Sequence, residues 1–354
     1  MSASAVAADA LPPTSRGVLV LGRMFVHPLF DYLLIGGGLS LAFTAVVAAG
    51  LVRLDVLGVA LPLLLLVCNM AHFAASTVRL YAKPGAFQAH RFLTMALPLA
   101  TLAVLALATV FPAWLGAHLV ALYFTWSPYH YAAQAYGLAV MYCYRSGCAL
   151  TDREKTMLRL VCLLPFVVAF FNSTGAGLQW FVTPAAIVSH PAWSVTITGV
   201  RIVTSTLTFL MPALFLLSLA RKGKAMPAVS LLIVVANGVW WVVLTYMDAF
   251  LWATVFHAVQ YLAVVVIFHV KERRARPGDT TSWWVHALGF YGASLVLGYA
   301  LFQVLPLGLR AAGFGWAQTV ILVIATINVH HFIVDAYIWR LRRDPNYQVV
   351  VSPA

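Results

Sequence analysis

The chain has 354 residues, of which 62% are hydrophobic and 9% are charged, and its mean hydropathy is +0.90. This composition excludes soluble globular classes, because long apolar runs recur along the chain and indicate a polytopic helical membrane protein. The runs are continuous rather than alternating, which excludes a transmembrane β-barrel. We interpret the net charge of +12 as loop charge facing anionic lipid, not as a nucleic-acid surface.

In chain order, residues 1–26 read as a short disordered lead, because they lack the basic segment and apolar core of a signal peptide. Residues 27–340 form a single transmembrane domain, and residues 341–354 form a cytoplasmic tail. The apolar runs predict an all-α bundle of about ten spans: 33–52, 56–78, 93–112, 115–143, 159–176, 196–219, 228–246, 249–270, 284–305 and 316–338. The segment after the fifth span is either re-entrant or interfacial.

The distribution of positive charge predicts the orientation of these spans. With both termini in the cytoplasm, 19 of the 22 Lys and Arg residues fall on the cytoplasmic side. The other side keeps Arg53, Arg201 and Arg310. Cytoplasmic loops are rich in Lys and Arg, so we expect a protein of a bacterial-type inner membrane with both ends inside. The four cysteines show no metal-binding spacing, and we expect no disulfides.

Histidines occur inside or beside several of the predicted spans. Ionisable side chains at such depth are rare and usually face the interior of a bundle. A single one is more often a hydrogen-bonded packing residue, but packing does not require one in each of several spans. The candidate metal ligands are His27, just before the first span, and His72, His130, His257 and His331 within spans.

Four of the five candidates are followed, three or four residues later and on the same helix face, by an Asp or a Gln. A metal-bound imidazole needs an acceptor for its second ring nitrogen. The candidates for this role are Asp31, Gln134, Gln260, Asp335 and His330, which precedes His331. Alternatively, Asp31 and Asp335 are carboxylates at the membrane edge, paired with nearby arginines.

The helix rise of 1.5 Å per residue gives the depth of each span histidine below the first basic residue. His72 lies roughly 10 Å deep, His331 roughly 13 Å, and His130 and His257 roughly 21 Å. We expect helix tilt and kinks such as the one at Pro128 to bring these levels together at one site.

Imidazole ligands suit iron, copper and zinc, and thiolate clusters are absent from the sequence. We therefore expect a non-haem iron (Fe2+) site that uses O2 on an apolar small molecule entering from the bilayer. Two alternatives stay open: a haem- or copper-binding membrane protein, and a proton-coupled transporter with buried His and Asp. The sequence does not indicate the oligomeric state.

Aromatic residues near the histidines either line a substrate tunnel or simply pack the helices: Phe73, Tyr131, Tyr136 and Tyr261.

Four motifs carry a resemblance to a known family. They are His27-Pro-Leu-Phe-Asp31, His72-Phe73-Ala74, His257 with Tyr261 four residues later, and His330-His331-Phe332-Ile333-Val334-Asp335. In this order, over most of the chain, they resemble the motifs of the Brp/Blh family of membrane-bound β-carotene oxygenases. That family has its first proline before the histidine, a HFG motif, and a second histidine where this chain has Tyr261.

The resemblance implies central cleavage of β-carotene to retinal at an iron site held by His27, His72, His257 and His331. The residues themselves add His130, with Gln134 four residues later, as a candidate for the ligand that Tyr261 replaces. The sequence thus predicts a membrane-embedded, multi-histidine metal oxygenase acting on a lipid-soluble substrate.

Overall fold

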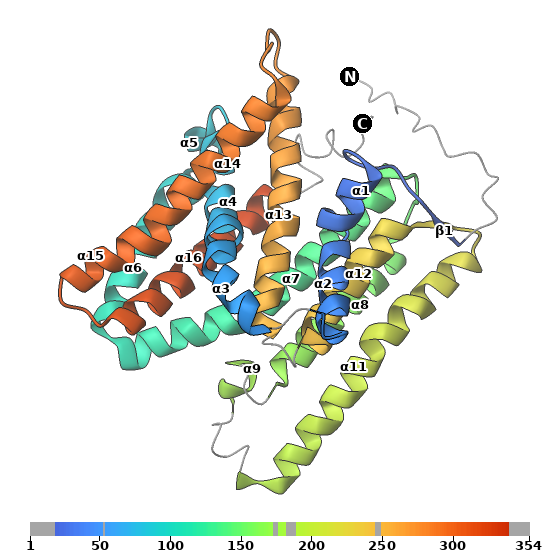
Figure 1. The fold of residues 1–354 in the computed structure, drawn as a ribbon, viewed down its shortest axis with the longest axis horizontal. Coiled ribbons are helices and arrows are strands. Elements are labelled where there is room, and N and C mark those ends of the chain that lie inside the picture. The colour runs from blue at the N-terminus through green and yellow to red at the C-terminus, as the bar shows by residue number, and fades with distance from the viewer. Residues whose placement is uncertain (1–17, 52–53, 173–175, 182–188, 245–248, 340–354) are drawn as a thin grey trace.

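The computed structural model describes residues 18–51, 54–172, 176–181, 189–244 and 249–339. Helices make up almost all of this part of the chain, which confirms the predicted all-α bundle (Figure 1). The elements are β1 (Leu19–Val20), α1 (Pro28–Phe30), η1 (Asp31–Ile35), α2 (Gly38–Ala48), α3 (Leu54–Leu64), η2 (Leu65–Met70), α4 (Ala71–Tyr81), α5 (Ala86–Ala89), η3 (Phe92–Ala96), α6 (Leu97–Val110), η4 (Pro112–Gly116), α7 (Ala117–Arg145), α8 (Asp152–Phe170), α9 (Ala176–Gln179), α11 (Pro191–Ala220), β2 (Met226–Pro227), α12 (Ala228–Val242), α13 (Ala249–Arg274), α14 (Trp283–Tyr299), η6 (Ala300–Val304), α15 (Leu305–Ala311) and α16 (Trp316–Ile338).

A helix lies at the position of each predicted span, but not every one is long and apolar enough to cross a membrane. Six helical segments of the described chain meet this requirement: Ala60–Tyr81, Phe92–Val110, Pro191–Ala220, Ala249–Arg274, Trp283–Ala311 and Trp316–Ile338. The helix α12 has only 15 residues, and α8 begins with a charged turn. The middle of α7 carries Ser127, His130 and Gln134. The count of ten spans therefore stays a prediction.

The first predicted span is not one continuous helix. The segment Pro28–Ile35 meets Gly38–Ala48 at an angle of 64°, and the pair gives a seventh span if it is counted as one. Gly37 sits at the bend with a φ of +83°, and a Cβ there would lie 2.5 Å from the Cβ of Ala236 on α12. Only glycine allows both this conformation and this close approach. Pro128, in contrast, lies inside the continuous helix α7.

Of the expected lead at residues 1–26, the structure describes residues 18–26. These residues have a defined structure in which Met24 and Phe25 are buried, so the lead is not disordered throughout its length, contrary to the expectation. Leu19–Val20 pair with Met226–Pro227 in a short parallel sheet, and Phe25 is buried. The predicted cytoplasmic tail, residues 341–354, lies outside the described residues.

The segments that the charge pattern assigns to the cytoplasm meet at one end of the bundle, which we call the basic end. Contacts join residues that are far apart in the sequence. They are the Arg79–Glu272 ion pair at 2.7 Å, the Arg145 Nε bond to the Met24 carbonyl at 2.9 Å, and the Lys224–Glu154 ion pair at 2.6 Å. The helix packing is thus consistent with a common side for these segments.

The helix α13 runs through the middle of the bundle, with α4 and α14 on one side and α12 on the other, while α7 packs against both α12 and α16 (Figure 1). In the most apolar stretch of α13, 78% of the residues are buried by other helices, against 22% for the peripheral helix α11. The core therefore surrounds α13.

The four cysteines are free, in agreement with the expected absence of disulfides: Cys68, Cys143, Cys148 and Cys162.

The buried carboxylate of Asp31 ties the packed lead to the bundle. It accepts hydrogen bonds from the backbone amides of Phe25, Val26 and His27 and from the hydroxyl of Tyr142. The substitution Asp31→Ala leaves these donors without an acceptor. We expect it to lower the free energy of unfolding by about 3 kcal/mol, since buried donors lose charge-assisted bonds. Thermal unfolding in detergent measures the change.

The control is Asp152→Ala, because the side chain of Asp152 is 93% exposed. We expect this variant to change stability by no more than about 0.5 kcal/mol. Equal losses in the two variants would contradict a special role of the Asp31 carboxylate.

Candidate metal centre

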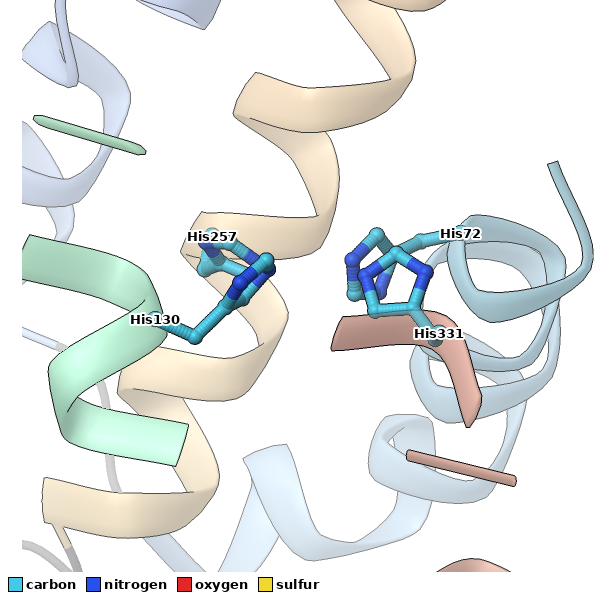
Figure 2. Close-up of side chains that lie close together, drawn as sticks. All are labelled: His72, His130, His257 and His331. Atoms are coloured by element: carbon cyan, nitrogen blue, oxygen red, sulfur yellow. The ribbon is translucent and has the colours of Figure 1, made fainter. Parts of the chain in front are cut away.

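Four histidines from four separate helices meet in the core. His72 lies on α4, His130 on α7, His257 on α13 and His331 on α16, and the rings turn toward a common centre (Figure 2). His72, His257 and His331 are fully buried, and His130 is 11% exposed. One potential ligand nitrogen from each ring lies within 4.8 Å of the other three. The structure therefore brings together four of the five predicted ligands.

The four rings form a closed square in which each imidazole contacts two others. Going round the square, the ring-centroid distances are 4.4 Å from His72 to His331, 5.2 Å to His130, 5.1 Å to His257 and 4.8 Å back to His72. Neighbouring rings are nearly perpendicular, with interplanar angles of 75° to 87°. This arrangement aims ring edges, where the nitrogens are, at neighbouring rings rather than stacking the faces.

Most of the ring nitrogens in the square have no hydrogen-bond partner. Both nitrogens of His72 and of His257, and Nε2 of His130 and of His331, are buried without one. An unsatisfied buried polar group costs about 1–3 kcal/mol. An aromatic ring contact returns only about 0.5–1.5 kcal/mol. Six unsatisfied atoms thus cost more than four ring contacts return, so packing alone does not account for the cluster.

A single metal ion fits this donor set. Metal–imidazole bonds are about 2.1 Å long, so two ligands on opposite sides of an ion lie about 4.2 Å apart. The observed limit of 4.8 Å exceeds this by about 0.6 Å, a gap that small side-chain rotations close. Neutral imidazole nitrogens are also the commonest protein ligands of transition metals. The buried cluster and the apolar helices together fit a membrane metalloprotein.

The neighbours of His331 determine which of its nitrogens faces the centre. The hydroxyl of Ser76, one helical turn after His72, donates to the carbonyl of Phe73 and lies 2.9 Å from Nδ1 of His331. With the hydroxyl hydrogen directed to the Phe73 carbonyl, Nδ1 carries the ring proton and donates it to the Ser76 oxygen. The lone pair of Nε2 is then left for a ligand.

A carboxylate lies at one edge of the square. Oδ2 of Asp335 is 3.4 Å from Nε2 of His331 and 3.8 Å from Nε2 of His130. These separations are long for hydrogen bonds but suit an oxygen donor that shares an ion with the two rings. The other oxygen, Oδ1, accepts a bond of 2.8 Å from the hydroxyl of Tyr261. Asp335 is therefore a buried neighbour of the histidines, as predicted.

Aromatic side chains hold His257 and His72 from outside the square. Tyr131 stacks on His257 with a centroid distance of 4.0 Å, and its hydroxyl bonds to Thr254 at 2.8 Å. Tyr261 packs edge-on against His72 at 4.7 Å. Because both tyrosines are fixed by hydrogen bonds of their own, they restrict rotation of the two imidazoles.

His27 does not belong to the cluster, contrary to the prediction. Its side chain is exposed, and Nδ1 accepts a bond of 3.2 Å from the backbone amide of Leu29 at the start of α1. Asp31 was predicted to orient His27, but its carboxylate binds backbone amides and Tyr142 instead. The His-x3-Asp spacing there serves a helix start rather than a metal.

Three other residues predicted to support the ligands make different contacts or none among the described residues. Nε2 of Gln134 donates to Oε1 of Gln260 at 2.9 Å, and Gln260 donates to the carbonyl of Ile35. The two glutamines thus bond to each other across α7 and α13 rather than to a histidine. His330 is partly buried and is not among the four converging histidines.

The aromatic candidates for a substrate tunnel divide in two. Phe73, Tyr131 and Tyr261 contact histidines of the square. Tyr136 packs instead against the core between α7 and α8 and is not among the ring contacts of the square.

Ser76 is a residue of the site that the sequence analysis did not identify. Its signal was the spacing of four residues from His72, which places it on the same helix face.

Comparisons with protein-family models, with curated proteins and with solved structures find no match. The resemblance of the four sequence motifs to the Brp/Blh family thus stays an expectation.

The Ser76–His331 hydrogen bond gives a prediction for metal affinity. The substitution Ser76→Ala removes the oxygen that fixes the His331 ring. We expect affinity for a divalent transition metal to fall about tenfold, the lower range for loss of a group that orients a ligand. Competition with a chromophoric chelator on the purified protein measures it.

Ser127→Ala is the matched control, because Ser127 is equally buried but bonds only to the Tyr123 carbonyl of its own helix. A drop of the same size in both serine variants would mean that Ser76 does not act through His331.

Proposed function

We propose that the protein is a membrane-embedded metal oxygenase that holds one iron ion (Fe2+) with His72, His130, His257 and His331. Its substrates are O2 and a lipid-soluble small molecule, and carotenoid cleavage is the form that the family resemblance implies. The observation that carries the proposal is the convergence of one nitrogen from each of four buried imidazoles within 4.8 Å, in a cluster where six ring nitrogens have no hydrogen-bond partner. The bound metal would supply activation of O2.

The donor set supports iron among the metals that bind imidazole. Four nitrogens with one carboxylate oxygen beside them form a hard-to-intermediate site without sulfur, since no cysteine belongs to the described metal-binding group. Copper binds imidazole as well, and elemental analysis of the purified protein distinguishes it from iron. Four rings packed edge to face round one centre favour a single ion over a porphyrin, because a macrocycle needs the space that two of the rings occupy.

The protein's own groups prepare the site for apolar chemistry. Ser76 fixes the His331 ring through Nδ1, and Tyr261 keeps the Asp335 carboxylate in place 3.4 Å from Nε2 of the same ring. Phe73 and Phe332 cover the square with apolar surface, at 4.4 Å from His72 and 4.6 Å from His130. A water-poor site of this kind suits O2 and a substrate that enters sideways from the bilayer.

The alternative of a proton-coupled transporter has weaker support. Transporters usually place their sites at broken helices in both halves of the chain. In the described residues, the one bent pair of apolar segments is at Gly36–Gly37, which lies on none of the four helices that carry the clustered histidines. The histidines lie instead on α4, α7, α13 and α16, which are helical at these positions.

The decisive experiment is elemental analysis of the detergent-purified protein and its variants. We expect about one iron per chain. Loss of a residue that only orients a ligand lowers metal affinity roughly 10–100-fold. We expect a larger loss of iron affinity when any one of the proposed ligands, His72, His130, His257 or His331, is replaced by Ala. His27→Ala should keep its iron, because the His27 side chain is exposed and distant from the square.

Each other outcome has a definite meaning. A folded wild-type protein that holds no metal after reconstitution would refute the oxygenase proposal in favour of a proton path. A strong haem absorption band, or stoichiometric copper, would replace iron. Loss of iron in a folded His27→Ala variant would contradict the ligand set and favour the set implied by the family resemblance.

We also propose that the basic end faces the cytoplasm, in a bacterial-type inner membrane and with about ten spans. The contacts among the Lys- and Arg-rich segments at this end support it. Arg274 and Arg310 are exposed residues from opposite sides of the predicted topology. We expect a membrane-impermeant maleimide to label Arg310→Cys in intact cells, and to label Arg274→Cys only after permeabilisation.

The unsubstituted protein is the control, because any labelling of its four free cysteines gives the background. The reverse labelling pattern would invert the topology. Labelling of both variants in intact cells would contradict the span count between them.

A further inference from the structure

The bundle contains a cavity that none of the predicted site residues lines. Its volume is about 630 Å³, within the range of small-molecule sites. It lies between α7, α8, α11 and α16, with walls such as Val120, Phe124, Phe166 and Ile321. These residues belong to the halves of their helices that lie away from the basic end. The walls are mainly apolar, so the cavity suits a hydrocarbon.

One charged side chain faces this apolar space. Arg201 on α11 is the single charged residue among the described residues that line the cavity. It is about 15 Å along the helix from Pro191, so it lies within the span rather than at its end. Its Nε is buried without a hydrogen-bond partner, and the described residues offer its guanidinium no ion pair. A cation at this depth is costly, and such residues usually serve a binding site.

The chemistry of the cavity indicates the headgroup of its ligand. A guanidinium binds a carboxylate through two parallel hydrogen bonds. A doubly charged phosphate is more often held by a cluster of arginines, and no second Lys or Arg lines the described part of the cavity. Thr125, Asn172 and Gln318 supply the remaining polar groups of the walls. The set matches one negative charge with a polar surround.

The size of the cavity indicates the length of the apolar part. If one methylene takes about the volume of a water molecule, roughly 30 Å³, the cavity holds about 20 such groups. This corresponds to a single acyl chain. A lipid with two chains is about twice too large.

The cavity adjoins the histidine square. Pro128 lines it and lies two residues before His130 on α7. Trp241 also lines it, and a chain of ring contacts leads from Trp241 to Tyr131 at 6.0 Å and on to His257 at 4.0 Å. A ligand in the cavity therefore sits one aromatic layer away from the proposed metal ligands.

We propose that this cavity binds a long-chain carboxylic acid, with the carboxylate paired to Arg201 and the chain lying among α7, α8 and α16. The binding inference stands on the cavity and Arg201 and does not require a metal. Where the cluster holds iron, the acid occupies the position of a substrate or of a regulator beside it.

The test is equilibrium binding of radiolabelled oleate to the full-length protein in nanodiscs of neutral lipid. We expect Arg201→Gln to weaken oleate binding about tenfold or more, as removal of a charge-assisted pair does. Arg201→Lys should retain part of the affinity. The matched control is Arg310→Gln, which removes one positive charge from the same side of the predicted topology, outside the cavity. It should leave binding unchanged.

Other ligands and variants identify the groups that matter. Methyl oleate lacks the charge and should bind wild type and Arg201→Gln equally weakly. Ala121→Trp fills the cavity and should abolish oleate binding. His72→Ala should lose metal but still bind oleate, whereas Arg201→Gln should keep its metal, so failure of either proposal is visible without the other.

Three results would overturn the inference. They are equal oleate affinity in wild type and Arg201→Gln, equal affinity of wild type for oleate and methyl oleate, and tighter binding of dioleoyl phosphatidate than of oleate. The last would assign the cavity to a phospholipid headgroup. Size-exclusion profiles and unfolding temperatures confirm that each variant is folded.

Discussion

The cost of burying imidazole nitrogens without hydrogen bonds is the constraint on which the centre of this bundle depends. A polar partner normally satisfies each such nitrogen, yet those of His72 and His257 form no hydrogen bond to the described protein groups. A bound ion would take one nitrogen from each of the four rings at once, which apolar neighbours cannot do. The convergence of α4, α7, α13 and α16 on one point follows from this need. It also explains why α13, which carries His257, is the most enclosed of the candidate spans.

The sequence contained much of this centre because ionisable residues in apolar helices are conspicuous. His72, His130, His257 and His331 were predicted from position alone, and Asp335 from its spacing to His331. Their depths, counted along straight helices, differed by about 10 Å. The structure removes this difference by inclining α7 and α16 against α13 (Figure 1). Helix tilt depends on contacts between helices, so a count along single helices does not contain it.

The predictions that failed share one physical cause. His27 and Asp31 have the spacing of a ligand and its orienting carboxylate, but free backbone amides at the start of α1 compete for the same groups and win. Gln134 and Gln260 lie on the correct faces of their helices, yet they bond to each other across the helix interface. Tyr261, four residues after His257, donates its hydrogen bond to Asp335 on α16. Partners on another helix cannot be read from spacing within one.

The same argument from cost separates two kinds of positive charge in this chain. At the basic end, carboxylates pair with positive side chains near helix ends, as Glu272 does with Arg79 and Glu154 with Lys224. Their positions therefore report topology. Arg201 lies within α11 and faces an apolar cavity, so no such partner satisfies it among the described residues. If Arg201 is not counted as a loop charge, the excess of Lys and Arg on the predicted cytoplasmic side becomes larger. Like the four histidines, Arg201 is an ionisable group at a depth where such groups are costly and usually face a binding site.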